Sequence, residues 1–188
     1  MEATLTRSPG RALGISGALL AVGFIVAMLV FGRPPESTWR VQSEVGGLLR
    51  EPPARIQRVL ITTDGRRLDF ARMASGTWVD SGRASPVPEA IAFHLERSLR
   101  AMHASPPVRI LTRDEWTDGA LREFGLEPPS YAVTLAPDGA APLEAAFGVP
   151  NPQKVLQYMR VTGHDTVYLM SRFVGQEWEH VINAATPP

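Results

Sequence analysis

The sequence predicts an α+β protein with one N-terminal transmembrane helix, followed by a mainly antiparallel sheet whose helices pack on one face. Three observations support this fold class. An uncharged apolar run occupies residues 12–32. Short segments of alternating apolar residues then occur in two blocks, and each block is followed by a helical segment with an apolar stripe. The order strand, strand, strand, helix therefore occurs twice, which is consistent with two diverged copies of one unit.

The apolar run is long enough to cross a bilayer as a helix. It spans 21 positions without a charged residue, and about 20 apolar residues suffice to span the hydrocarbon core. It exceeds the usual core of a signal peptide, and no small-residue cleavage site precedes Arg33. We therefore expect a cytoplasmic tail at 1–11, a retained transmembrane helix at 12–32, a tether at 33–53 and a folded domain at 54–188.

The charges that flank the run leave its orientation nearly balanced, with Arg7 and Arg11 before it and Arg33 and Arg40 after it. A short tail before a first helix usually stays in the cytoplasm, and long domains translocate largely regardless of charge. The single lysine and the many Ala, Arg, Gly and Pro residues are typical of a GC-rich bacterial genome. We expect a bacterial inner (cytoplasmic) membrane protein with a periplasmic domain, and Arg11, Arg33 and Trp39 at the membrane interface.

Small residues form one face of the predicted transmembrane helix. Gly14, Gly17, Ala18 and Ala21 fall at i, i+3, i+4 and i+7, a spacing that lets a second helix approach closely. Glycine and alanine are also common in membrane helices that have no partner. If this face packs against a second helix, the expected partners are integral membrane proteins of a larger complex within the lipid bilayer.

The first block of the domain reads as three strands and a helix. A β-rich run at 56–61 leads to Asp64-Gly65, a strong hairpin signal, and 66–73 alternates as the return strand. A third short strand is expected at 78–79. The helix is expected over 89–102, where the apolar residues form a single stripe: Ile91, Leu95, Leu99 and Met102.

A short helical connection opens the second block. After an apolar run at 108–111, Thr112 and Glu115 match a capping box. A short helix is expected over 118–124, closed by Gly125.

The second block then repeats the pattern of strands followed by a helix. Strands are expected at 131–135, 143–149, 155–161 and 166–170. The apolar residues of the closing helix share one face: Val174, Trp178, Val181 and Ile182.

Several motifs occur in a characteristic order: Gly76-Thr-Trp78, Phe124-Gly-Leu-Glu-Pro-Pro129, Phe147-Gly148 before Pro150-Asn-Pro152, and Tyr158-Met-Arg-Val161 leading to Asp165-Thr-Val-Tyr-Leu169. Together they resemble an uncharacterised bacterial family of membrane-anchored α+β domains, some linked to auxiliary components of gliding-motility-type ABC transporters. The resemblance covers about Ile56 to Ile182. It implies an extracytoplasmic α+β domain and carries no catalytic residues over to this chain.

Composition and motifs exclude several classes of chemistry. There is no cysteine, which removes disulfides, thiolate metal sites and lipoprotein acylation. The formal net charge is zero and no basic block is present, so nucleic acid is not an expected partner. Neither G-x-x-x-x-G-K-[ST] nor G-x-G-x-x-G occurs, so we expect no nucleotide.

The remaining polar and aromatic candidates have structural explanations. The histidines lack the spacing of a helical metal site: His94, His103, His164 and His180. His164-Asp165 reads as a turn rather than part of a triad, because no G-x-S-x-G elbow is present. Asp114-Glu115 read as acids at a helix start. Three tryptophans are expected in the core: Trp78, Trp116 and Trp178. We expect no catalytic residue, metal or cofactor.

The function that these observations favour is a non-enzymatic single-pass accessory or structural subunit of a larger bacterial membrane complex, for transport, photosynthesis or respiration. Its helix would pack in the membrane and its domain would dock on the periplasmic side. The alternative is a membrane-tethered periplasmic binding module for a small ligand, peptide or glycan, which predicts an apolar pocket with converging polar groups. A hydrolase of unrecognised type would need a cleft with a nucleophile and a base.

Overall fold

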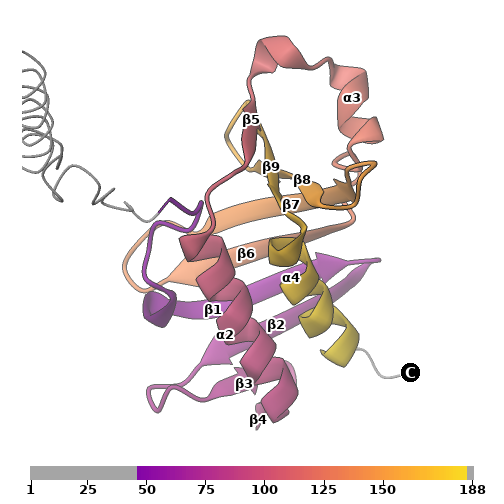
Figure 1. The fold of residues 1–188 in the computed structure, drawn as a ribbon. Helices are drawn as coiled ribbons and strands as arrows, with labels where there is room; N and C mark the ends of the chain where they lie inside the picture. The colour runs from indigo at the N-terminus through magenta and orange to yellow at the C-terminus, as the bar shows by residue number, and fades with distance from the viewer. Residues whose placement is uncertain (1–45, 186–188) are drawn as a thin grey trace, which may run out of the picture. The chain divides into compact units, whose positions relative to one another are not determined.

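A nine-stranded antiparallel sheet organises the computed structural model, which describes residues 46–185 (Figure 1). The strand order is β4-β3-β2-β1-β6-β7-β8-β9-β5. The strands are β1 (Ile56–Thr63), β2 (Arg66–Arg72), β3 (Trp78–Asp80), β4 (Ser85–Pro86), β5 (Arg109–Leu111), β6 (Tyr131–Pro137), β7 (Leu143–Pro150), β8 (Leu156–Val161) and β9 (Val167–Ser171). The helical elements are η2 (Pro53–Arg55), α2 (Glu89–Ala104), η3 (Arg113–Glu115), α3 (Asp118–Glu123) and α4 (Arg172–Ala185). The predicted α+β class with an antiparallel sheet is confirmed.

The hairpin between β1 and β2 forms where the sequence predicts it. Thr63 pairs with Arg66, so the loop has two residues. Asp64 and Gly65 both have positive φ, at 44° and 72°, and a two-residue loop with this geometry matches the twist of the flanking strands. Asp-Gly is among the few pairs that adopt it at little cost. The turn therefore sets the register of the first two strands.

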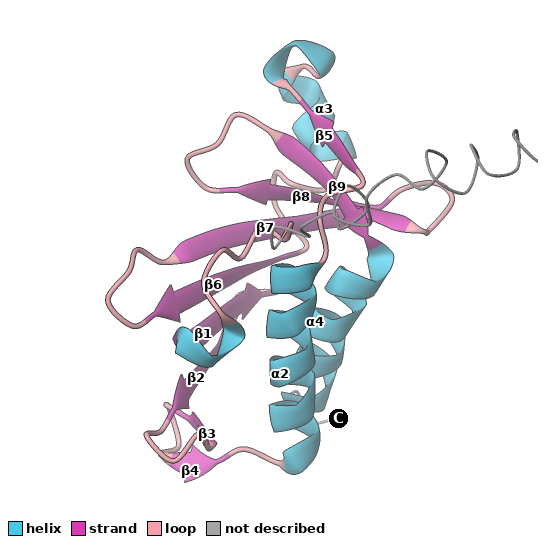
Figure 2. Ribbon diagram, turned by 60° about the vertical axis from the view of Figure 1, so that its left-hand side comes forward, coloured by secondary structure: helices cyan, strands magenta, loops and turns pink. Residues whose placement is uncertain are grey.

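The main core lies between the sheet and the pair α2 and α4, which pack side by side on one face (Figure 2). The expected stripe of α2 is buried, with Leu95, Leu99 and Met102 at 0% exposure. The predicted apolar residues of α4 are also buried: Val174, Trp178, Val181 and Ile182. Opposite them, alternate residues of the central strands are buried, such as Val59, Val133 and Phe147. The periodicities of 3.6 and 2 in the sequence thus converge on one core.

A second, smaller core covers one end of the opposite face of the sheet. Val167 and Leu169 alternate along β9 with Tyr168 and Met170 of the main core, so the two clusters lie on opposite faces. The segment that carries η3 and α3 covers this second cluster, which contains Leu111, Trp116, Leu121, Leu126, Val167 and Leu169. The expectation that all helices pack on one face is therefore wrong for α3. Both faces of β9 are buried, because its successive side chains enter the two cores in turn. A short apolar run in the sequence does not show whether one face of a strand is covered or both.

The two halves of the sheet share one connectivity. β1 to β4 form an antiparallel meander followed by α2, and β6 to β9 form another followed by α4. β1 and β6 are adjacent and antiparallel at the centre, where Val59 is the partner of Leu135 and Ile61 of Val133. Each half thus has four strands before its helix. The first half has β4 in addition to its three expected strands, and the second half has the four strands expected there, so the repeating unit has four strands rather than three.

The end of the segment predicted as a tether belongs to the folded domain. The amide of Gly47 donates to the carbonyl of His103 at 3.1 Å, and that of Leu49 donates to the carbonyl of Met102 at 3.1 Å. Leu49 is 2% exposed within the main core, and its carbonyl lies 2.9 Å from Nδ1 of His103. The predicted boundary at Ala54 is therefore too late. A short segment punctuated by glycine and proline reads as linker, although Leu49 is a core residue and Leu48 packs against the core.

Several predictions concern residues outside the described part of the chain. These are the span 12–32, the packing face of Gly14, Gly17, Ala18 and Ala21, and the interface residues Arg11, Arg33 and Trp39. Among residues 46–185, no helix has the length and apolar character that crossing a membrane requires.

Candidate functional site

A cavity of about 390 Å³ lies between β2, the segment that contains β4, the start of α2 and the end of α4. Its volume falls within the range of about 300–1,000 Å³ typical of ligand pockets. The apolar lining residues are Leu68, Phe70, Pro86, Val87, Pro88, Ile91, Ala184 and Ala185. The polar or charged ones are Arg67, Asp69, Asp80, Arg83 and Ser85.

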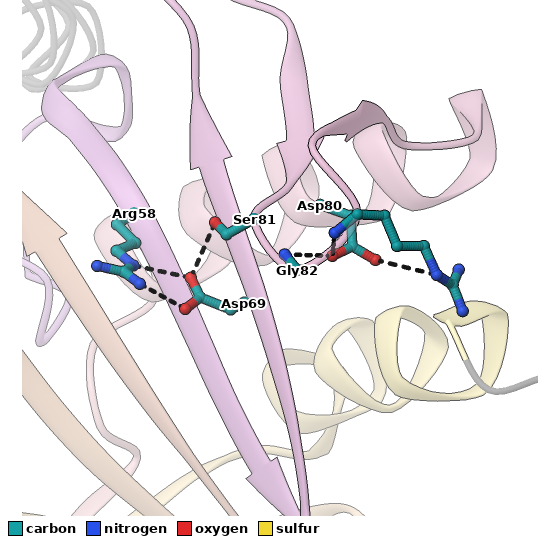
Figure 3. Close-up of polar contacts among 6 residues, drawn as sticks. Arg58, Asp69, Asp80, Ser81 and Gly82 are labelled. Carbon is teal, nitrogen blue, oxygen red and sulfur yellow. Dashed lines mark hydrogen bonds and ion pairs between the residues drawn. The ribbon is translucent and has the colours of Figure 1, made fainter.

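The cavity exists because β3 is short. Of the residues of β2, only Phe70–Arg72 pair with β3. The first half of β2 therefore lacks a full strand neighbour on that side. One bond continues the pairing, from the amide of Ser81 to the carbonyl of Asp69 at 2.9 Å. The chain then turns at Asp80, whose Oδ1 accepts from the amides of Gly82 at 2.8 Å and Arg83 at 3.2 Å (Figure 3). This turn carries the chain around the cavity to β4.

The two carboxylates at the cavity are already engaged. Asp69 accepts from Nε and Nη2 of Arg58 at 2.8 and 2.5 Å and from Oγ of Ser81 at 3.2 Å (Figure 3). The hydrogen bonds from Arg58 lower the pKa of Asp69 although partial burial opposes them. Oδ2 of Asp80 lies 3.9 Å from Nε of Arg83, whose side chain is 76% exposed. The acids of this site therefore hold the local backbone in place.

The lining offers apolar contact and charge rather than a nucleophile with its base. Among the described residues that border the cavity there is no histidine, cysteine or lysine, and Ser85 is the only hydroxyl. An acyl-transfer or hydrolytic site places a nucleophile, a base and an orienting group within hydrogen-bond reach of one another. The chemistry suited to this cavity is the binding of a group that has both apolar and polar parts.

A second candidate site is a patch on the helix layer, formed by Phe93, Arg97 and Phe173 and here termed the Arg97 patch. The guanidinium lies 5.4 Å from the ring centre of Phe93 and 5.5 Å from that of Phe173. Both rings are well exposed, at 54% and 45%. Nη2 of Arg97 donates to Oε1 of the buried Glu177 at 2.9 Å. Arg97 is thus fixed between two exposed aromatic rings.

Glu177 is the anchor beneath this patch. It is 4% exposed, and its second oxygen lies 3.1 Å from Nδ1 of His94. Burial disfavours the charged carboxylate, but the hydrogen bonds from His94 and Arg97 outweigh it, so the pKa of Glu177 lies below its ordinary value. A buried carboxylate of α4 that contacts both Arg97 and His94 of α2 holds the two helices in one relative position.

His94 and His180 stack on each other, with ring centres 4.8 Å apart and planes at 15°. They come from α2 and α4, and only the packing of the two helices brings them together. The sequence therefore did not predict their contact. Within residues 46–185 there is no cluster of three potential ligands able to hold a metal ion.

The other sequence candidates have structural positions. Trp78, Trp116 and Trp178 are buried, at 2%, 7% and 0% exposure, which confirms them as core residues. Thr112 and Glu115 form the predicted capping box, at the start of η3. His164 follows β8 in a turn, and its Nδ1 lies 3.3 Å from the hydroxyl of Tyr168.

No family model, curated protein or solved structure matches this chain. The resemblance to a family of membrane-anchored domains therefore stays a prediction from the sequence motifs.

Proposed function

We propose that this protein is a non-enzymatic, single-pass accessory subunit of a bacterial membrane complex, anchored by residues 12–32, with its α+β domain docking on integral membrane proteins from the periplasmic side. The observation that carries the proposal is the Arg97 patch. Arginine and aromatic residues dominate the energetics of protein interfaces. The ordering of Arg97 by Glu177 before a partner arrives reduces the entropy that docking would otherwise cost.

The small-residue face of Gly14, Gly17, Ala18 and Ala21 is the proposed contact within the bilayer. The two contacts would act together, because an anchor that confines the domain to the membrane raises its effective concentration beside a membrane partner. This combination allows a modest periplasmic surface to suffice for stable association.

The test is a pull-down of the full chain from gently solubilised native membranes, followed by identification of the proteins recovered with it. A stoichiometric set of integral membrane proteins is expected with the wild-type chain. Phe93→Ala together with Phe173→Ala should reduce recovery by about 30-fold or more, since a hot-spot pair contributes about 2 kcal/mol or more.

The matched control is Met73→Ala, which removes another exposed apolar side chain, 53% accessible, from the turn that follows β2. Recovery with this variant should equal that of the wild type. A wild-type chain that is recovered alone and monomeric in mild detergent would contradict the proposal.

A second candidate function is a membrane-tethered periplasmic binding module for a small ligand, peptide or glycan. The specific observation in its favour is the cavity of about 390 Å³ with an apolar floor formed by residues such as Phe70 and Ile91. This candidate is compatible with the first, because the cavity and the Arg97 patch involve different residues.

A further inference from the structure

The two halves of the sheet are related by an approximate two-fold relation that extends to their turns and helix ends. The hairpin turns Asp64-Gly65 and Asp138-Gly139 occupy corresponding places after β1 and β6. Ile61 pairs with Leu68 in one half, and Leu135 pairs with Leu143 in the other. Each position beside one hairpin therefore has a counterpart beside the other.

The two long helices are also followed by matching sequences. α2 ends at Ala104 and is followed by Ser105-Pro106-Pro107, and α4 ends at Ala185 and is followed by Thr186-Pro187-Pro188. Proline has no amide hydrogen, so it cannot donate to the carbonyl four residues earlier. Each helix therefore leaves two specific carbonyls without their intrahelical donors: Met102 and His103 in α2, and Asn183 and Ala184 in α4.

At the end of α2, the chain's own N-terminal segment supplies the missing donors. The amides of Leu49 and Gly47 bond the carbonyls of Met102 and His103, each at 3.1 Å. The side chain of Leu49 is buried there. Leu48 and Leu49 also border a hollow together with Pro137 and Leu143 of the adjacent hairpin. An extended apolar segment thus caps the helix and fills the space beside the hairpin.

At the end of α4, the corresponding place is the cavity of about 390 Å³. Ala184 and Ala185 border it from the helix, and Leu68, the counterpart of Leu143, borders it from the hairpin. Phe70 and Ile91, both at least 95% buried, complete the apolar floor. The cavity therefore combines two features that hold Gly47–Leu49 in the other half, which are a helix end whose last carbonyls a following proline cannot bond and apolar side chains beside a hairpin.

We propose that this cavity binds an extended apolar peptide segment of a partner protein. The peptide's amides would donate to the carbonyls of Asn183 and Ala184, and a leucine-like side chain would enter the space beside Leu68 and Ile91. Gly47–Leu49 is the pattern for such a ligand, with a small residue where the chain passes the helix end and an apolar residue two positions later. The inference rests on the second candidate function, and its failure would leave the docking role of the Arg97 patch unaffected.

The experiment is a titration of the full chain in lipid nanodiscs with a fluorescein-labelled peptide of residues Ser43–Arg50, Ser-Glu-Val-Gly-Gly-Leu-Leu-Arg. Saturable anisotropy is expected. The same peptide with both leucines replaced by alanine should bind about tenfold or more weakly, because a buried leucine contributes about 1.5–3 kcal/mol.

Two variants locate the binding site. Ala184→Phe places a ring at the cavity border and should weaken binding by about tenfold or more. Gln176→Phe is the matched control, since it adds the same ring at an exposed position of α4 that does not line the cavity and takes no part in the proposed site. Its affinity should equal that of the wild type.

Methyl NMR separates the cavity from the α2 site, because Ile91 lies at the first and Met102 at the second. The proposal predicts that the Ile91 methyl signal shifts on titration while the Met102 signal does not. A Met102 shift alone would mean that the peptide displaces the chain's own segment, and an unsaturable titration would mean that no peptide binds. Either result would overturn the proposal.

Discussion

Gly148→Ala should destabilise the domain because the strand β7 and the end of α3 approach too closely for a side chain. A Cβ at Gly148 would lie 2.0 Å from the carbonyl oxygen of Phe124. That oxygen belongs to the backbone, and it already accepts from the amide of Val149 at 2.9 Å. The clash therefore cannot be relieved by a side-chain rotation, and α3 must move away from the sheet.

The magnitude follows from two losses and one gain. Overpacking a buried site costs about 1–3 kcal/mol, and loss of the bond between Val149 and Phe124 costs about 1 kcal/mol. The alanine restricts the unfolded chain and offsets about 0.4–1 kcal/mol. The expected net loss is about 1–3 kcal/mol in the free energy of unfolding.

Urea denaturation of the full chain, followed by tryptophan fluorescence, measures this loss. Gly119→Ala is the matched control, because it makes the same change in α3 where nothing lies within 4 Å of the new Cβ. The control should be neutral or more stable by up to about 1 kcal/mol, given the higher helix propensity of alanine. Equal stability of the two variants would refute the packing argument.

Three further predictions concern other parts of the domain. Leu49→Ala should lower the free energy of unfolding in urea by about 2–4 kcal/mol because Leu49 is buried. The control Val108→Ala, at a 63% exposed position, should change it by less than about 0.5 kcal/mol. Equal effects of the two variants would mean that residues 46–53 are a tether and not part of the folded domain. Because the pKa of Asp69 is lowered in the folded state from its ordinary value of 3.8, the stabilisation it contributes is present above that value and is lost as pH falls through the folded pKa. The decrease in unfolding free energy below about pH 4 should therefore be shallower in Asp69→Asn than in the wild type, and parallel pH profiles would contradict this assignment. Gly175→Ala should also destabilise the domain, since its Cβ would lie 1.7 Å from Oε1 of Gln157. Gln157 is 1% exposed, and its Nε2 donates to the carbonyl of Gly148 at 2.8 Å. Thermal unfolding should show a lower midpoint than that of Gly119→Ala, and an unchanged midpoint would show that Gln157 can move away freely.

Local patterns determined most of the secondary structure. The stripe from Ile91 to Met102 and the pair Asp64-Gly65 act through contacts within a few residues, so their outcomes could be predicted from sequence alone. The core positions of the tryptophans followed from their size. The alternating strands also predicted an antiparallel sheet, because short turn signals connect neighbours that run in opposite directions.

Tertiary structure decided the features on which the functional proposals rest. His94 and Glu177 are 83 residues apart, and their contact depends on how α2 and α4 pack. Leu49 lies in the core although its neighbours resemble a linker. Its amide and that of Gly47 bond carbonyls at the end of α2, which is more than 50 residues away in sequence. The cavity beside α4 arises from a strand, β3, that stops after three residues. The sequence by itself determined the elements, the uncharged run at 12–32 and the absence of familiar catalytic motifs, whereas long-range packing determined which surfaces a partner could meet.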